Sequence, residues 1–315
     1  MRALASPDCS AATAPGRPLG PGGTTSVAAG RSPFGVAATP DGRWAFATVL
    51  GTAGVAASVE VLRLATAAGT GSAPAVTVVR TVPLPSAAGS PAGAAVTPDG
   101  KYLLVADGAG AVVISVARAE AGTAGAVLGS LAAPARAGRP AGPGSAIEVA
   151  VSPDSRFAFV TLEYEDEAVV FNLAAALARG FGAAAYVGAI PLGSAAVGMA
   201  VSPDGRWLYA TSEGAVPGQH PVGSEPVGLA AVRGGALLVV ADSNRFGAPG
   251  QSSTLSVVDV SAALAGRAAI VGDLPSGGFP RDMSLSPSGT LLVSDYTSGR
   301  VQAIATAPLP TAPAA

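Results

Sequence analysis

A short apolar strand, a tight turn and a second apolar strand follow one another six times along the chain. In most copies the turn is Pro-Asp-Gly or a close variant, as at Pro40-Asp41-Gly42. Proline presets φ, aspartate bonds its own backbone and glycine accepts a positive φ, so each copy predicts two antiparallel strands joined by a tight turn. The six copies are Gly35–Thr48, Gly93–Asp107, Ile147–Thr161, Val197–Ser212, Val227–Asp242 and Arg281–Asp295.

Two more apolar stretches follow most of these pairs, such as Ser58–Leu62 and Val76–Val82 after the first. Four antiparallel strands, here called a to d in chain order, in a repeat of about 50 residues are typical of a β-propeller blade. The sequence therefore predicts an all-β protein, with one β-propeller domain of four-stranded antiparallel blades over residues 24–306. Residues 1–23 are predicted to be a disordered N-terminal segment, and residues 307–315 a Pro/Ala-rich tail.

Two places depart from the regular repeat. Only 30 residues separate the equivalent turn positions Pro203 and Arg233, too few for four strands, so the fourth blade is expected to have lost most of its outer pair within Glu213–Glu225. The last repeat has three strands before the proline-rich tail, which cannot form a ladder strand. Residues 24–29 are therefore expected to pair with residues 299–305 and to close the ring.

The ends of several b strands carry a shared signature, as in Phe46-Ala47-Thr48, Phe159-Val160-Thr161 and Tyr209-Ala210-Thr211-Ser212. Together with the Ser-Pro-Asp-Gly turns, this repeat resembles the YVTN β-propeller repeat, which is similar to the WD40-like propellers. The wider family includes seven-bladed proteins similar to bacterial lactonases. Six recognisable repeats instead of seven then imply an internal deletion.

Composition removes several function classes. The net charge of −2 gives no electrostatic reason to expect nucleic acid as a partner. Cys9 is the only cysteine and His220 the only histidine, so an intramolecular disulfide, a His-rich zinc site and a haem attachment motif are excluded. The longest uncharged stretches are interrupted by glycine and proline, so no membrane span is expected. The first residues lack the apolar region of a secretory signal, whereas the family resemblance allows an extracytoplasmic location.

Polar residues gather where the b strands end, on the face opposite the Pro-Asp-Gly turns. Glu148 and Asp282 begin inner strands, from which they could project into the central channel, and Asn244 and Arg245 lie in a long loop. Carboxylate oxygens would suit Ca²⁺ or a cationic ligand, but the same residues commonly satisfy turn amides. The candidate ligand-binding residues are Asp107, Glu148, Glu163, Glu213, Asp242, Asn244, Arg245 and Asp295.

Two functions fit this pattern. The first is a non-catalytic propeller without a cofactor, which binds a protein, a glycan or a small ligand on the face formed by the b–c loops. The alternative is a lactonase-like hydrolase with an acidic channel mouth that uses an arginine and binds Ca²⁺. The scarcity of histidine weighs against the hydrolase, so the sequence favours the binding protein.

Overall fold

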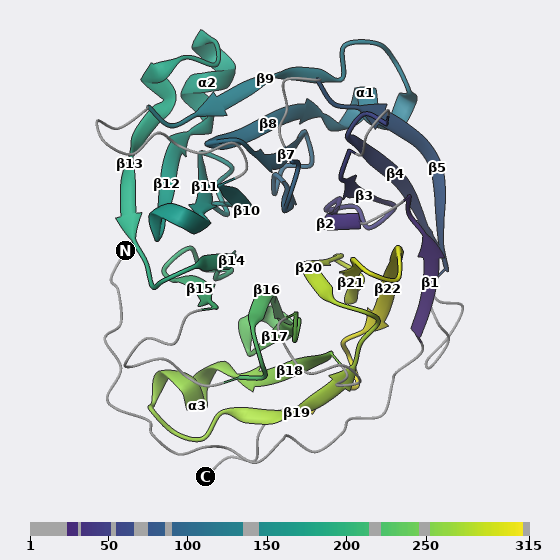
Figure 1. The fold of residues 1–315 in the computed structure, drawn as a ribbon, viewed down its shortest axis with the longest axis vertical. Helices are drawn as coiled ribbons and strands as arrows, with labels where there is room; N and C mark the ends of the chain where they lie inside the picture. The colour runs from purple at the N-terminus through teal and green to yellow at the C-terminus, as the bar shows by residue number, and fades with distance from the viewer. Residues whose placement is uncertain are drawn as a thin grey trace.

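The computed structural model describes residues 24–30, 33–51, 55–65, 75–85, 90–134, 145–213, 222–245 and 253–310. Figure 1 shows them as a ring of antiparallel sheets around a central axis, with the blades following one another in chain order. In this part of the chain, five sheets have four strands and one has two. The predicted all-β propeller of six repeats is therefore confirmed.

The blades are numbered by their inner strands. The strands of blades one to three are β2 (Pro33–Ala38), β3 (Trp44–Val49), β4 (Ser58–Ala65) and β5 (Ala75–Pro83); β6 (Ala94–Val96), β7 (Tyr102–Asp107), β8 (Gly110–Ser115) and β9 (Val127–Ala132); and β10 (Ala146–Val151), β11 (Phe157–Leu162), β12 (Glu167–Asn172) and β13 (Tyr186–Pro191). Those of blades four to six are β14 (Ala196–Val201) and β15 (Leu208–Ser212); β16 (Pro226–Val232), β17 (Leu237–Asp242), β18 (Thr254–Asp259) and β19 (Ile270–Pro275); and β20 (Pro280–Leu285), β21 (Thr290–Asp295), β22 (Arg300–Ala305) and β1 (Thr24–Ala28).

Short helices follow strand c in three blades. They are α1 (Val116–Ala121), α2 (Leu173–Arg179) and α3 (Val260–Leu264), and the side chains of Ser115, Asn172 and Asp259 cap their N-termini. Single 3₁₀ turns are η1 (Glu163–Glu165), η2 (Ala183–Ala185) and η3 (Arg233–Gly235). None of the helices in the described ranges is long and apolar enough to cross a membrane.

The a–b turns use the chemistry that the sequence indicates. In blade three the Ser152 hydroxyl donates to Asp154, and the Arg156 amide donates to the same carboxylate oxygen at 3.1 Å. The hydrogen bond from Ser152 lowers the pKa of Asp154, so the turn favours the carboxylate form. Asp41, Asp99 and Asp204 make the equivalent contacts in their own turns.

Neighbouring blades are joined by a hydroxyl on strand b. The Thr48 hydroxyl accepts from the Gly35 amide in its own blade and donates to the Ala92 carbonyl in the next blade, both at 2.6 Å. A Cβ on Gly35 would lie 2.3 Å from that same carbonyl oxygen, so glycine is required for this close approach. Three other blades use an equivalent hydroxyl in the same way, from Thr161, Thr211 and Ser294.

The two ends of the chain close the ring as predicted. Strand β1 pairs with β22 in antiparallel register from Thr24↔Ile304 to Ala28↔Arg300. The seam is also closed at its inner edge, where the Val36 amide donates to the Asp282 carboxylate at 2.7 Å. The last blade is thus completed by the N-terminal strand.

Blade four has two strands in the described part of the chain, in agreement with the short interval in the sequence. Of the irregular loop predicted for residues 213–225, residues 214–221 lie outside the described residues. The predicted tail begins against the ring, because Leu309 is buried and Arg233 donates to its carbonyl. The predicted N-terminal segment 1–23 lies outside the described residues, as do residues 311–315.

Removal of β1 should destabilise the propeller. We expect deletion of residues 1–28 to lower the melting temperature by several degrees, because loss of about 1–3 kcal/mol has that effect in a domain of this size. Deletion of residues 1–23, which leaves β1 in place, is the control in the same thermal-unfolding assay. Equal melting temperatures for the two truncations would contradict closure by β1.

The hydroxyl of Thr48 can be tested by an isosteric change. Thr48→Val leaves a buried amide and a buried carbonyl without their partner, so we expect a loss of about 1–3 kcal/mol in unfolding free energy. Thr48→Ser keeps the hydroxyl and should be much closer to the unmodified protein in urea unfolding. If the valine variant were as stable as the serine variant, the hydroxyl would not join the blades.

Candidate functional site

The acidic residues at the ends of the b strands form two groups rather than one ring. Asp107, Asp242 and Asp295 are the last residues of β7, β17 and β21, whereas Glu163 and Glu213 follow the last residues of β11 and β15. Side chains alternate along a strand, so an offset of one residue turns the two groups in different directions. The a–b turn aspartates lie at the opposite ends of the b strands, as expected.

The aspartate group binds its own blades. Asp242 accepts from the hydroxyl of Ser256 at 2.6 Å and from that of Thr254 at 3.2 Å, and burial raises its pKa to about 6. Asp295 accepts from the Ser276 hydroxyl at 3.4 Å, and burial raises its pKa to about 7. Asp107 ends a tight hairpin in which it pairs with Gly110. These contacts match the alternative in which the aspartates satisfy local polar groups.

The glutamate group meets Arg245 at the mouth of the channel. One terminal nitrogen of Arg245 lies 2.5 Å from Oε2 of Glu213 and 3.4 Å from Oε1 of Glu163. The Glu213 side chain is only 6% exposed, and this burial raises the pKa of its carboxyl group. Its Oε1 is buried and has no hydrogen-bond partner among the described residues. The structure therefore brings three of the predicted residues together in one cluster.

Asn244, beside Arg245, has a positive φ of 49°, and its amide donates to the Ser224 carbonyl at 3.2 Å. Asparagine is one of the few residues that tolerate this backbone conformation. Its place in the turn explains the residue type without a ligand.

A second arginine, Arg281, was missed by the sequence analysis. It is buried, and its guanidinium carbon lies 3.8, 4.8 and 5.9 Å from the ring centroids of Phe34, Phe279 and Tyr296. Burial and the charge of Arg245 lower its pKa to about 10, so it stays cationic at neutral pH. The sequence did carry a signal for Arg281, because a charged residue stands there at a repeat position that is apolar in every other strand a. The equivalent residues are Phe34, Ala92, Ile147, Val197 and Val227.

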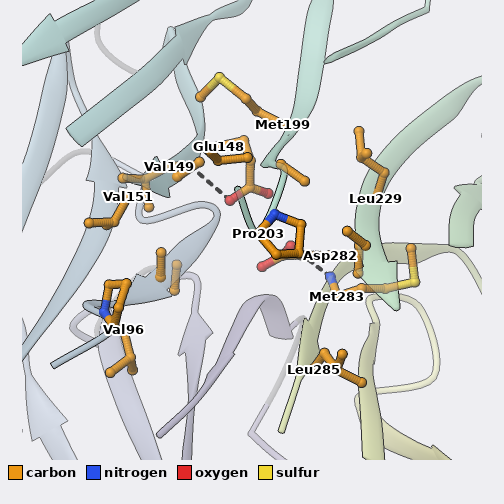
Figure 2. Close-up of a pocket in the computed structure, with 18 residues that line it drawn as sticks. Val96, Glu148, Val149, Val151, Met199, Pro203, Leu229, Asp282, Met283 and Leu285 are labelled. Carbon is orange, nitrogen blue, oxygen red and sulfur yellow. Dashed lines mark hydrogen bonds between the residues drawn. The ribbon is translucent and has the colours of Figure 1, made fainter. Parts of the chain in front are cut away.

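Below the mouth, two acids meet across the channel. Glu148 on β10 and Asp282 on β20 occupy the repeat position that is glycine in the other four blades. The two carboxyl groups hydrogen-bond to each other, which requires a shared proton. The Val149 amide donates to Glu148 at 2.8 Å, and the Met283 amide donates to Asp282 at 2.6 Å (Figure 2).

The hydrogen bonds favour Glu148 as the partner that holds the proton. Asp282 accepts from the amides of Val36 and Met283 on its two different oxygens, as a carboxylate does. Burial, and then the charge of Asp282, raise the pKa of Glu148 well above its usual value. Gly93 makes room for this carboxyl, since a Cβ there would lie 2.3 Å from Oε1 of Glu148.

The acid pair borders a cavity of about 250 Å³ in the channel. Its other walls are mostly apolar, and Figure 2 shows Val96, Met199, Leu229 and Leu285 around it. Among the residues that the structure describes, no group of three or more His, Cys, Asp or Glu side chains could hold a metal ion. Calcium binding therefore remains a prediction from the sequence alone.

The closed ring, the charged mouth and the inner acid pair define a β-propeller with a central channel site. A model of the family described as "Lactonase, 7-bladed beta-propeller" matches residues 23–308. The chain belongs to this lactonase propeller family, although its described residues form six sheets. No curated protein matches the sequence.

Many solved structures resemble this chain, and two of them illustrate the range. Hydrazine synthase of Kuenenia stuttgartiensis has a TM-score of 0.53 and 16% sequence identity, and the match covers 88% of this chain and 96% of that one. The periplasmic gluconolactonase of Pseudomonas aeruginosa has a TM-score of 0.49 and 21% identity, and the match covers 79% and 72% of the two chains. The likeness to hydrazine synthase shows a common fold and nothing more.

The acid pair makes stability depend on pH. Both carboxyl groups ionise near pH 4 in the unfolded chain, whereas the folded chain keeps a proton on Glu148 at higher pH. The folded state then binds more protons, so stability falls as pH rises above about 5 and through the raised pKa of Glu148. The raised pKa values of Asp242 and Asp295 act in the same direction. We expect a higher melting temperature at pH 5 than at pH 8.

Two amide variants locate the proton. Glu148→Gln copies the protonated acid, so it should raise the melting temperature at pH 8 and flatten its pH dependence. Asp282→Asn offers one carbonyl oxygen to two amides and should lower the melting temperature at both pH values. The reverse pattern would place the proton on Asp282.

Proposed function

We propose that this protein hydrolyses the lactone of a hydroxy acid at the mouth of its channel. The observation that carries the proposal is the cluster of Glu163, Glu213, Arg245 and Arg281, which holds two cations and two acids partly or fully out of water. Membership of the lactonase propeller family supports the same reading. The binding protein favoured by the sequence becomes the second candidate.

Glu213 suits the role of general base. Its raised pKa brings the carboxylate closer to the basicity that is useful at neutral pH. Arg245 binds Oε2, whereas Oε1 is buried and has no protein partner among the described residues, so Oε1 is the oxygen left to accept a proton from a water molecule that enters the site with the lactone. Arg281 remains positively charged and can stabilise the oxygen anion that develops on a lactone carbonyl.

The reaction then needs no further reactant. Water loses a proton to Glu213 and attacks the carbonyl carbon, and the negative charge moves to the carbonyl oxygen near Arg281. When the carbonyl forms again, the ring C–O bond breaks, and the leaving alkoxide takes the proton back from Glu213. The product is the ring-opened hydroxy acid, which ionises to its carboxylate.

One observation favours binding without hydrolysis. Phe34, Phe279 and Tyr296 surround Arg281, and such aromatic contacts fix a guanidinium in place. A fixed cation next to aromatic rings can bind a sugar acid without any chemical step. A thermal-shift assay separates the two candidates, because a ligand of the native state raises the melting temperature whether or not it reacts.

The test is hydrolysis of glucono-δ-lactone, γ-butyrolactone and dihydrocoumarin. Hydrolysis is measured as the rate of acid release above the spontaneous rate. We expect Glu213→Gln to lower kcat for the lactone that is hydrolysed by about 10²-fold or more, as loss of a general base does. Arg281→Lys should also lower kcat/KM, because lysine lacks the planar guanidinium.

Glu60→Gln is the matched control, since Glu60 is partly exposed on β4 and its carboxylate accepts from Thr81. It should leave the rate unchanged. Full activity in Glu213→Gln would remove Glu213 from the mechanism. Thermal stabilisation by a sugar acid without hydrolysis of any lactone would support the binding protein instead.

A further inference from the structure

Within the described residues, blade four ends at β15, whose outer edge corresponds to the edge that strand c covers in the other blades. Ala210 on β15 is exposed, whereas the equivalent residues Ala47, Val105, Val160, Val240 and Val293 are at most 4% exposed. In those blades, strand c lies beside strand b. No strand of the described residues pairs with the outer edge of β15.

The register of β14 and β15 identifies the groups on this edge. Ser202 donates to the Trp207 carbonyl at 2.9 Å, so residues 207, 209 and 211 direct their backbone groups toward β14. The N–H and C=O groups of Leu208 and Ala210 therefore point to the open side. In each of the other blades, an amide at the end of strand c or directly after it donates to the carbonyl just before strand b, as Leu173 does to Arg156 at 2.8 Å. Arg206 holds the equivalent carbonyl position in blade four.

Apolar side chains border the edge on both sides. Leu208 packs against the same cluster, around Phe159 and Ala168 of blade three, as Val170 and Ile190, and these last two and Leu208 are partly exposed. On the other face, Tyr209 packs against the cluster around Val240 and Val258 of blade five, and the partly exposed Leu238 and Ile270 pack against the same cluster. A strand placed beside β15 would thus meet hydrogen-bonding groups at its edge and apolar walls on its two faces.

The sequence after β15 is a poor match for this place. It contains Pro217, Gly218 and Pro221, and proline has no N–H to donate to a ladder. The complete blades show what the place accepts, because strands c such as Ala-Val-Val-Phe in β12 are buried or half-buried on both faces. An occupant needs the same continuous apolar, β-branched character.

We propose that an extended apolar segment of a partner protein binds beside β15 as the missing strand c of blade four. The backbone of the segment supplies the hydrogen bonds, and its side chains fill the spaces between blades three and five. This is strand addition to a sheet edge, in which backbone pairing gives affinity and side-chain fit gives specificity. The site lies along the outer edge of β15, a strand that contributes no residue to the lining of the channel cavity.

The probe is a fluorescent peptide with the sequence of β12, Glu167–Asn172, flanked by lysines for solubility. In blade three, Val169 and Phe171 pair with Val160 and Ala158 through the edge that faces β11. N-methylation of the peptide residues that correspond to Val169 and Phe171 should weaken binding at least tenfold in fluorescence anisotropy. N-methylation of the peptide residues that correspond to Ala168 and Val170 blocks only the peptide edge that faces away from β15 and should change affinity little.

Two variants test the protein side. Ala210→Pro removes an outward N–H and should weaken binding of the unmethylated peptide at least tenfold, whereas Ala210→Val keeps the N–H and should bind normally. Hydrogen exchange should show fast amides at Leu208 and Ala210 in the free protein and slow ones with the peptide. The two methylated peptides keep the test informative if Ala210→Pro does not fold.

The proposal is overturned by any of three results. The first is no binding of the β12 peptide, and the second is equal binding of the two methylated peptides. The third is slow exchange at Leu208 and Ala210 in the free protein, which would mean that the chain already covers its own edge.

Discussion

The close approach of successive inner strands is the constraint on which this propeller depends. A Cβ on Gly35, Gly198 or Gly228 would lie within 2.5 Å of a backbone oxygen in the next blade. The strand-b hydroxyls then bridge the two blades across this short gap. The ring is closed, and the seam between the last and first blades carries the same bridge, because the Ser294 hydroxyl donates to the Phe34 carbonyl.

The same constraint determines where the channel chemistry can lie. Glycine occupies this inner position in four blades and leaves no side chain in the channel. Glu148 and Asp282 replace it in blades three and six, so two carboxyl groups enter a space without other polar side chains. Their mutual hydrogen bond and the surrounding backbone amides make this tolerable, since a buried charge must be paired or neutralised. The result is a polar layer between the charged mouth and the apolar cavity.

The fold was predictable from the sequence because its determinants are local. The turn residues, the alternation of apolar positions and the extra strand at Thr24–Ala28 each lie within one short segment. The site was predictable only in part. Glu163, Glu213 and Arg245 were identified as loop residues, but a difference of one position at the end of strand b separated them from Asp242 and Asp295. Arg281 was missed because its aromatic surroundings form only in the folded ring, where Phe34 of the first blade meets Phe279 and Tyr296 of the last.

The charges at the mouth also influence how the ring-opened product of the proposed lactone hydrolysis would leave the site. A neutral lactone adds no charge beside Glu213, whereas the ring-opened product carries a carboxylate. That new anion is attracted by Arg281 and repelled by Glu163 and Glu213, the same two carboxylates whose charges raise the pKa of Arg281. When Glu213 has returned its proton and is ionised, the acids oppose the bound anion and weaken its hold on Arg281. In the proposed reaction the carboxylate form of Glu213 therefore links the two halves of the cycle, because the form that accepts a proton from water is also the form that favours release.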